Sequence, residues 1–331
     1  MNSLLSVISW FYRLGPKVMR FLIRNHIKKQ ETVQIPVISI GNITFGGSEK
    51  TPLAIELIKF LLKNSQKPAF VSRGYKGEWE KKGGDLHPQD RPSPGWRALG
   101  DEPYMAYKNA SQAGIFVGKN RIQSCRLAHR KGYDVAVLDD GFQYYSLKKD
   151  LEIVLHNPGK KTPLRESVSS LKRAHMILVK KSGPAFGQTS LSTQFPQTQV
   201  YEYSVVPKEI IKMETGHPSP PDPFRSNKVL AFCGIANPQR FIQTLLKNKI
   251  RPAGFLKFPD HYEYPQKALH QIRDKHRSLN SDVIITTEKD AVKLEGRSLI
   301  SSWPLYYQKI ALDLDNDFYE QVLSILNRLK K

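Results

Sequence analysis

The chain has 331 residues, of which 40% are hydrophobic, and this fraction excludes a wholly disordered protein. It carries 51 Lys and Arg against 30 Asp and Glu, so its formal net charge is +21. Such an excess favours a polyanionic partner, which is a nucleic acid, a phosphate compound or an anionic membrane face. The length suits two domains of ordinary size.

The chain has two cysteines, Cys125 and Cys233, which lie far apart and form no paired CxxC motif. This pattern indicates neither a disulfide framework nor a zinc site, and it suits a reducing compartment. Both cysteines stand among apolar residues, so we expect them to pack in the core.

Residues 1–30 combine apolar and basic side chains, with Trp10 and Phe11 among aliphatic residues and with Arg13, Lys17 and Arg20 nearby. No run in the chain approaches the roughly 18–20 apolar residues that span a bilayer. A cleavable signal peptide has its charge before the apolar region, a pattern that this segment lacks. We predict a basic amphipathic helix at the membrane interface. A helix packed on the protein's own core is the alternative.

From residue 35 onward, short apolar runs alternate with helical patterns. Residues 36–40 are the first strand candidate, and a glycine-rich turn separates them from a helical pattern at 51–64. Pro52 suits the start of that helix. Further strand candidates lie at 69–72, 115–117, 135–138, 151–155 and 176–179. Apolar strands that alternate with helices predict a parallel α/β sheet covered on both faces.

Two segments interrupt the alternation. Residues 74–99 are rich in Gly, Pro and charged residues and predict a long functional loop, and residues 215–227 predict a linker. More strand candidates follow at 229–232, 255–258 and 283–286, and a closing helix at 317–329. The expected parts are a membrane-associated helix at 1–30, a core at 31–214, the linker at 215–227, a smaller α/β domain at 228–314 and a C-terminal helix at 315–331.

The turn after the first strand, Gly41–Thr51, is a candidate phosphate-binding loop. A loop between a strand and a helix aims backbone N–H groups and a helix N-terminus at an anion. Lys50 could reach the β- and γ-phosphates of a nucleotide, and the Thr51 hydroxyl could hold Mg²⁺. The pattern GxxxxGK[ST] fails at both glycine positions, which hold Thr44 and Glu49. A structural turn without a ligand is the alternative.

Asp139 and Asp140 follow the strand candidate 135–138 and precede Gly141. A carboxylate at the end of a parallel strand faces the edge where α/β sheets bind ligands. One such aspartate near Thr51 would complete a magnesium site of the Walker B kind. An ordinary Asp-Asp-Gly turn is the alternative.

Asp101 stands before a helical pattern, where it could be a helix N-cap or a general base that acts on a hydroxyl. His261 could tune or relay that proton. The sequence does not place these two residues together.

Taken together, these segments resemble the tetraacyldisaccharide 4′-kinase family. The motifs that carry the resemblance run in order along the chain: GNITFGGSEKTP at 41–52, SRGY at 72–75, GDEP at 100–103, DDGFQY at 139–144, PLRE at 163–166, LKRA at 171–174, GIANPQRF at 234–241, FPDH at 258–261 and TEKDAVK at 287–293.

The resemblance implies an α/β fold that has a P-loop-containing nucleotide hydrolase-like core, with a parallel sheet, and a smaller second α/β domain. It implies a kinase that uses ATP and Mg²⁺ and phosphorylates the 4′-hydroxyl of a tetraacyldisaccharide 1-phosphate, which forms lipid IVA in lipid A biosynthesis. It also implies peripheral attachment to the cytoplasmic face of the bacterial inner membrane. The expected partners are the lipid disaccharide and an anionic membrane surface, without nucleic acid or an obligate protein partner.

The matching motifs also carry residue roles. The residues implied at the nucleotide and metal are Gly46, Gly47, Ser48, Lys50, Thr51, Asp139, Asp140, Arg165 and Glu166. Among them, Lys50 and Thr51 would contact phosphates and metal, and the two aspartates would complete the metal shell.

On the acceptor side, the resemblance implies that Asp101 is the base and that His261 assists it. Arg73 and Arg121 are candidates for contacts with the phosphorylated lipid head or the nucleotide.

The chain departs from the family pattern at Glu49, where the family has glycine, and at Tyr144, where it has histidine. Glutamate adds a negative charge near a phosphate, and tyrosine cannot carry the positive charge of imidazolium. A catalytically weakened homologue that binds nucleotide or lipid therefore stays open as an alternative to an active kinase. The net charge of +21 leaves a second alternative open, a basic P-loop protein that binds nucleic acid.

Overall fold

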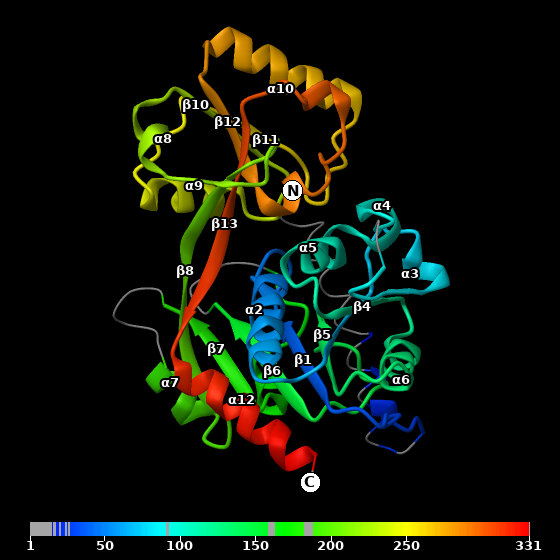
Figure 1. Ribbon diagram of the computed structural model, residues 1–331. Coiled ribbons are helices and arrows are strands. Elements are labelled where there is room, and N and C mark those ends of the chain that lie inside the picture. The colour runs from blue at the N-terminus through cyan, green and yellow to red at the C-terminus, as the bar shows by residue number, and fades with distance from the viewer. Residues whose placement is uncertain are drawn as a thin grey trace. The chain divides into compact units, whose positions relative to one another are not determined.

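The computed structural model describes residues 15, 18, 19, 21–23, 25, 27–90, 93–157, 163–181 and 188–330 (Figure 1). The chain forms two compact units, one of Met1–Ser204 with Asp313–Lys331 and the other of Val205–Leu312. Two strands, β8 (Gln199–Lys212) and β13 (Leu305–Leu314), continue from one unit into the other.

The first unit contains a largely parallel sheet in the order β8-β7-β6-β1-β5-β2-β4-β3, in which β3 is antiparallel to β4. Its other strands are β1 (Val37–Asn42), β2 (Pro68–Ser72), β3 (Gly84–Leu86), β4 (Gly114–Val117), β5 (Val135–Asp139), β6 (Leu151–His156) and β7 (Met176–Lys180). Its helices are α2 (Lys50–Lys63), α3 (Trp79–Lys82), α4 (Trp96–Leu99), α5 (Asp101–Asn109), α6 (Arg121–Arg130), the 3-10 helix η1 (Val168–Arg173), α7 (Gln188–Gln194) and α12 (Asn316–Leu329).

The central strands of this sheet are buried along their whole length, as parallel strands covered by helices must be. Figure 1 shows α2 and α12 in front of the strands, and the rings of Phe60 and Tyr319 join these two helices at a centroid distance of 5.1 Å.

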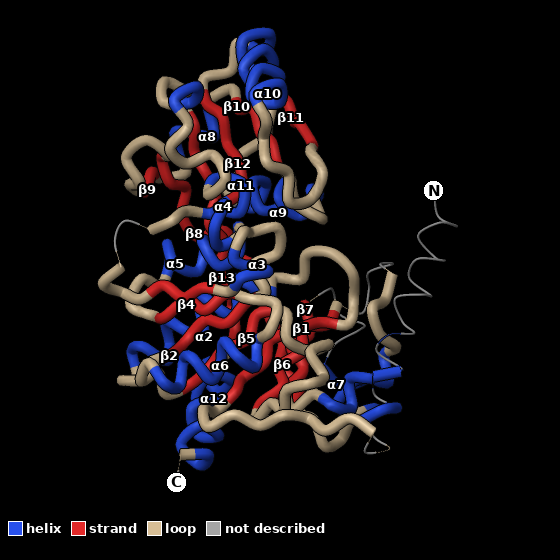
Figure 2. Tube along the Cα trace, turned by 90° about the vertical axis from the view of Figure 1, so that its right-hand side faces the viewer, coloured by secondary structure: helices blue, strands red, loops and turns tan. Residues whose placement is uncertain are grey.

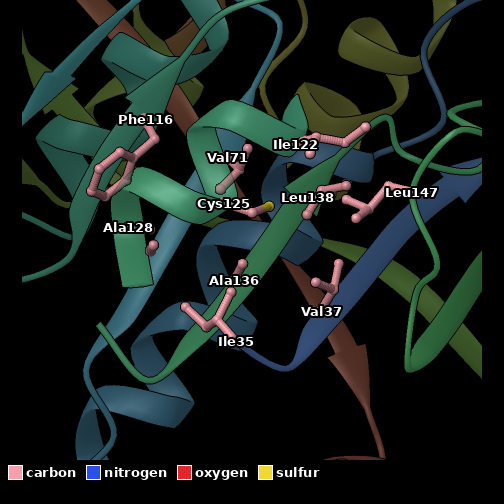
Figure 3. Packing of buried hydrophobic residues seen from close by; sticks show 11 residues of the cluster. Ile35, Val37, Val71, Phe116, Ile122, Cys125, Ala128, Ala136, Leu138 and Leu147 are labelled. Atoms are coloured by element: carbon pink, nitrogen blue, oxygen red, sulfur yellow. The ribbon is translucent and has the colours of Figure 1, made fainter. Parts of the chain in front are cut away.

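Helix α6 contributes Ile122, Cys125 and Ala128 to an apolar cluster (Figure 3). The spacing of these residues places them on one side of the helix. They pack with Val71 of β2 and Leu138 of β5. This core holds the end of β5, where Asp139 lies, against the rest of the sheet.

The second unit has parallel strands in the order β11-β10-β12-β13, and β9 pairs with β8 in antiparallel fashion. Its elements are β9 (Pro218–Ser219), α8 (Asp222–Ser226), β10 (Val229–Cys233), α9 (Pro238–Lys247), β11 (Gly254–Lys257), α10 (Gln266–Leu279), β12 (Val283–Thr287), α11 (Glu288–Ala291) and the 3-10 helix η2 (Ser298–Ile300). Figure 2 shows α10 running alongside β10 and β11. Apolar clusters line both sides of these strands.

The structure confirms the predicted α/β class and each strand and helix predicted in the described residues, within two residues at each end. The prediction of a long loop at 74–99 is wrong, because this segment contains α3, β3 and α4. Elements of three or four residues are too short to show a period in the sequence.

Residues 215–227 also differ from the predicted linker, since they belong to the second unit and include β9 and α8. Pro218 and Ser219 pair with Ile211 and Ile210 of β8, which ties this proline-rich stretch to a strand. The units divide at 204/205 and at 312/313, inside β8 and β13, whereas the sequence suggests a boundary near 214.

The predicted membrane-associated helix at 1–30 lies for most of its length outside the described residues. Of the residues described there, Val18, Phe21 and Ile27 are exposed. No helix in the described part of the chain is long and apolar enough to cross a membrane.

Both cysteines are reduced and fully buried, as expected. Burial disfavours the thiolate and raises the pKa of Cys125 to about 12, and it raises that of Cys233 to about 12 with a further contribution from Asp290. We therefore predict that neither thiol reacts with a thiol reagent in the native protein at pH 8, whereas both react after denaturation. Peptide mapping after a short exposure checks this, and rapid native labelling of either cysteine would contradict it.

Candidate active site

The loop from the end of β1 to the start of α2 is held from below by the segment after β5. A Cβ atom on Gly41 would lie 2.4 Å from Cβ of Phe142, so only glycine allows this approach. On its other side, the loop pairs with residues 163–166: Phe45 N–H donates to Pro163 O at 2.9 Å, and Arg165 N–H donates to Ile43 O at 2.7 Å. The loop and the PLRE motif therefore form one layer.

Asn42 closes the loop upon itself. Its Nδ2 donates to Ser48 Oγ at 2.7 Å and to Thr44 Oγ1 at 3.1 Å, and its Oδ1 accepts from Lys50 Nζ at 3.3 Å. Lys50 Nζ also lies 3.4 Å from Ser48 Oγ. These contacts hold the Lys50 ammonium group against the loop rather than in open solvent.

Glu49 adopts a left-handed backbone conformation, with φ 56° and ψ 23°, immediately before α2. Glycine adopts this conformation without strain, and another residue does so at a cost of about 1–3 kcal/mol. The Glu49 carboxylate contacts Lys180 Nζ and Tyr203 Oη, each at 3.4 Å. Lys50 contacts Asn42, Ser48 and Asp140 instead, so the glutamate and the lysine beside it contact different side chains.

Thr51 and Asp139 form a buried hydrogen bond, in which Thr51 Oγ1 donates to Asp139 Oδ2 at 2.7 Å. This contact follows from topology, because β1 and β5 are adjacent parallel strands and Ile40 lies opposite Asp139. Among the described residues, the other oxygen, Oδ1, is buried and accepts no hydrogen bond. Burial, followed by repulsion from Glu102, raises the pKa of Asp139 to about 7.

Asp140 comes next in a left-handed conformation, with φ 55°. Both of its oxygens lie 2.9 Å from Arg165 Nη1, and Lys50 Nζ lies 3.2 Å from Oδ1. Burial would raise the pKa of Asp140, but the charges of Lys50 and Arg165 outweigh it and hold the pKa well below the ordinary value. The structure thus brings Lys50, Thr51, Asp139, Asp140 and Arg165 into one cluster.

The oxygens and charges of this cluster fit a magnesium ion. Asp139 Oδ1 is buried without a hydrogen bond, and the Thr51 hydroxyl lies beside the same carboxylate. Mg²⁺ prefers such oxygen ligands and is commonly bound by one or two carboxylates together with substrate phosphates. The described residues contain no group of three or more His, Cys, Asp or Glu side chains able to hold a metal by themselves. Water molecules or the phosphates of a nucleotide would supply the remaining ligands of a metal here.

Glu166 is 2% exposed and pairs with Arg173. Arg173 Nη2 donates to both carboxylate oxygens, at 3.0 and 2.9 Å, and its guanidinium lies over the rings of Phe142 and Tyr145 at 4.1 and 4.7 Å. Gln143 Nε2 bridges Glu166 Oε1 and the Asn42 carbonyl, at 3.0 and 2.9 Å. This network supports the loop from behind.

Asp101 is the first residue of α5, so the N-cap alternative is wrong; Gly100, with φ 93°, occupies the cap position. The Asp101 Oδ1 atom accepts a hydrogen bond from the Glu102 N–H at 3.0 Å, and the residue is 5% exposed. Gly100 packs on the SRGY segment, where its Cβ would lie 3.0 Å from the Gly74 carbonyl carbon. Because Glu102 raises the pKa of Asp139, this end of α5 lies within electrostatic reach of the cluster.

The two remaining arginine candidates differ in their contacts. Arg121 lies 4.8 Å from the Tyr144 ring centroid; burial lowers its pKa, and the nearby Asp140 raises it. Arg73 pairs with Glu80 at 2.6 Å, and its side chain is 45% exposed. Repulsion from Arg73 also lowers the pKa of Arg121, so both guanidinium groups are in the same neighbourhood.

His261 belongs to the second unit. It has φ 55°, its backbone N–H donates to Asp260 Oδ1 at 3.0 Å, and its Nε2 lies 3.2 Å from Lys289 Nζ.

The sequence analysis assigns no role to four residues that contact the site in the structure, although each lies inside one of the motifs: Asn42, Glu102, Gln143 and Arg173. The side chains of an asparagine after a strand or an arginine in LKRA have no distinguishing spacing. Their roles depend on partners that only the folded chain brings close.

The sheet is parallel, and its first strand leads through a loop that carries a lysine and a threonine into a helix. An aspartate at the end of the neighbouring strand, β5, contacts the threonine. These features define an α/β phosphotransferase of the P-loop class. The model of the family described as tetraacyldisaccharide-1-P 4'-kinase matches residues 1–327. The chain belongs to this family.

Curated relatives agree with the family match. The tetraacyldisaccharide 4'-kinase of Desulfotalea psychrophila is 33% identical over 93% of this chain and 91% of its own, and that of Halothermothrix orenii is 32% identical over 88% and 82%. The structure of LpxK from Aquifex aeolicus in complex with ATP has a TM-score of 0.73 and 23% identity, covering 98% of this chain and 99% of that chain. This structural similarity concerns the fold.

Replacing Arg173 by alanine should destabilise the first unit, because it removes the guanidinium group that donates to both oxygens of the buried Glu166 carboxylate. We expect a loss of about 2–3 kcal/mol, which lowers the denaturation temperature by about 5–10 °C. Arg173→Lys is the matched control and should lose less, since it keeps the charge. Thermal unfolding measures both, and an unchanged midpoint for Arg173→Ala would contradict the supporting role.

Proposed function

We propose that this chain transfers the γ-phosphate of ATP to the 4′-hydroxyl of a tetraacyldisaccharide 1-phosphate. The observation that carries the proposal is the buried contact of Thr51 with Asp139 beside the Lys50–Asp140–Arg165 group. This arrangement gathers a phosphate-binding cation, a metal-binding hydroxyl and two strand-end carboxylates at one loop, as phosphoryl transfer requires.

The phosphates of ATP would lie along the loop that includes Gly46, Gly47 and Ser48. Backbone N–H groups at the start of α2 and the Lys50 ammonium group would bind the β- and γ-phosphates. Lys50 would then exchange part of its contact with Asp140 for phosphate oxygens. Arg165 remains on Asp140 and keeps that carboxylate neutralised.

Mg²⁺ would be held by Thr51 Oγ1 and Asp139, with Asp140 close by. When bound, the ion would neutralise the charge that develops on the phosphate oxygens. Thr51 positions its hydroxyl through the hydrogen bond to Asp139, and Glu166 supports the loop through Arg173 and Gln143.

Asp101 would accept the proton of the 4′-hydroxyl as the hydroxyl oxygen bonds to the γ-phosphorus, while the bond from that phosphorus to the β–γ bridging oxygen breaks and ADP leaves. Its place at the start of α5, next to Glu102, whose charge acts on Asp139, supports this role. His261 would assist Asp101, a role that rests on the matching FPDH motif. Arg121 and Arg73 would bind anionic groups of the lipid head or the nucleotide.

The acyl chains of the substrate would remain in a membrane. We propose that the chain works as a peripheral protein at the cytoplasmic face of the inner membrane. The exposed side chains of Phe21 and Ile27 and the net charge of +21 support contact with an anionic lipid surface.

A radiolabelled ATP assay with the purified lipid disaccharide and Mg²⁺ tests the proposal directly. We expect labelled lipid product that depends on both Mg²⁺ and acceptor. If the purified protein binds Mg-ATP but transfers no phosphate under any condition, the weakened homologue becomes the better description. Glu49→Gly separates the two, because a silent protein that becomes active with glycine is limited by its loop.

Two substitutions should separate binding from chemistry. Lys50→Ala should weaken ATP binding and lower turnover together, since the lysine contacts phosphate in both the ground and transition states. Asp101→Ala should leave ATP binding within about twofold of wild type and lower kcat by about a hundredfold or more, the usual contribution of a general base.

Direct titration of ATP, together with steady-state kinetics, measures both effects. Asp101→Asn is the matched control, because it keeps the size of the side chain but cannot accept the proton. Full turnover in Asp101→Ala would dismiss the base assignment.

A further inference from the structure

Glu49 places a buried negative charge inside the phosphate-binding loop. The residue is 7% exposed, precedes Lys50 directly and has a left-handed backbone that favours glycine. A carboxylate beside a phosphate site repels the ligand, and low solvent access strengthens the repulsion. A loop that binds nucleotide with glutamate here needs a group that neutralises the charge.

Two side chains from neighbouring strands meet this carboxylate. Lys180 Nζ, at the end of β7, lies 3.4 Å from Oε1, and Tyr203 Oη, in β8, donates to Oε2 at 3.4 Å. Lys180 and Tyr203 lie opposite each other in the register of the parallel pair β7–β8. Their side chains therefore point to the same face of the sheet, and each engages one oxygen of Glu49.

The same arrangement leaves Lys50 to other partners. Its ammonium group contacts Asn42, Ser48 and Asp140. If the Glu49 carboxylate had no cation of its own, it would compete for Lys50 and would repel the phosphates that Lys50 binds.

We infer that Lys180 is a positioning residue of the kinase: it neutralises Glu49 and holds the carboxylate on β7 and β8, away from Lys50 and the nucleotide. Tyr203 fixes the second oxygen. The inference rests on the proposed function, because it concerns the ATP site, and it explains how this chain tolerates an acidic residue where the P-loop pattern GxxxxGK[ST] has glycine.

Lys180→Ala, Glu49→Gln and the double variant Glu49→Gln/Lys180→Ala test the inference, with ATP affinity in the presence of Mg²⁺ measured by titration and KM and kcat measured for lipid phosphorylation. Lys181→Ala is the matched control, since it removes the same charge from the next, exposed residue. If Lys180→Ala fails to fold, Lys180→Gln and its double variant with Glu49→Gln give the same comparison with smaller loss of volume.

Lys180→Ala should weaken ATP binding about tenfold and raise KM for ATP similarly, with a smaller change in kcat, because a buried charge next to the site loses its partner. Glu49→Gln should bind ATP at least as tightly as wild type. The double variant should return to within about twofold of Glu49→Gln, and Lys181→Ala should match wild type. A purely structural pair would not show this rescue of ATP affinity.

Three results overturn the inference while the proposed function survives. The first is wild-type affinity in Lys180→Ala. The second is an equal loss in the single and double variants, which would mean that Lys180 binds phosphate itself. The third is weakened binding in Glu49→Gln. If the wild-type protein itself binds no Mg-ATP at millimolar concentration, the proposed function fails and the inference fails with it.

Discussion

The site depends on one adjacency, that of the carboxyl ends of β1 and β5. Because these strands are parallel neighbours, the residue that opens α2 and the residue that ends β5 meet in a buried hydrogen bond between Thr51 and Asp139, although 88 positions separate them in the chain. The apolar cluster formed by α6, β2 and β5 packs against the strand that ends in Asp139 (Figure 3).

Close backbone approaches hold the surrounding motifs in place. Gly41 allows Phe142 to lie against the loop, and Gly100 allows α5 to start against the SRGY segment at Gly74. The chemistry of such a site depends on side chains, but these backbone contacts decide where the side chains can be. A methyl group at Gly41 would displace the loop that carries Lys50 and Thr51, and one at Gly100 would displace the start of α5, where Asp101 lies.

The sequence predicts the sheet well because buried parallel strands are short, continuous apolar runs, as in Val135–Asp139. It also places Asp139 and Asp140 at a strand end where one of them could meet Thr51, and the structure shows that Asp139 makes this contact. It misses β8 and β13, whose buried and partly exposed positions mix polar and apolar residues. It misses Arg173 because the partner, Glu166, is recognised only after the chain between them has folded into η1.

Glu49 shows that the effect of a residue that departs from a sequence motif depends on the side chains around it. From the sequence alone, a glutamate at this position is expected to strain the backbone of the loop and to repel phosphate. In the fold, the carboxylate contacts a lysine and a tyrosine from two strands outside the loop, 131 and 154 positions away. The backbone strain remains, but the charge is compensated locally. A loop's tolerance for an acidic residue is therefore a property of the neighbouring strands, and substitutions in β7 or β8 should be judged together with the loop that they support.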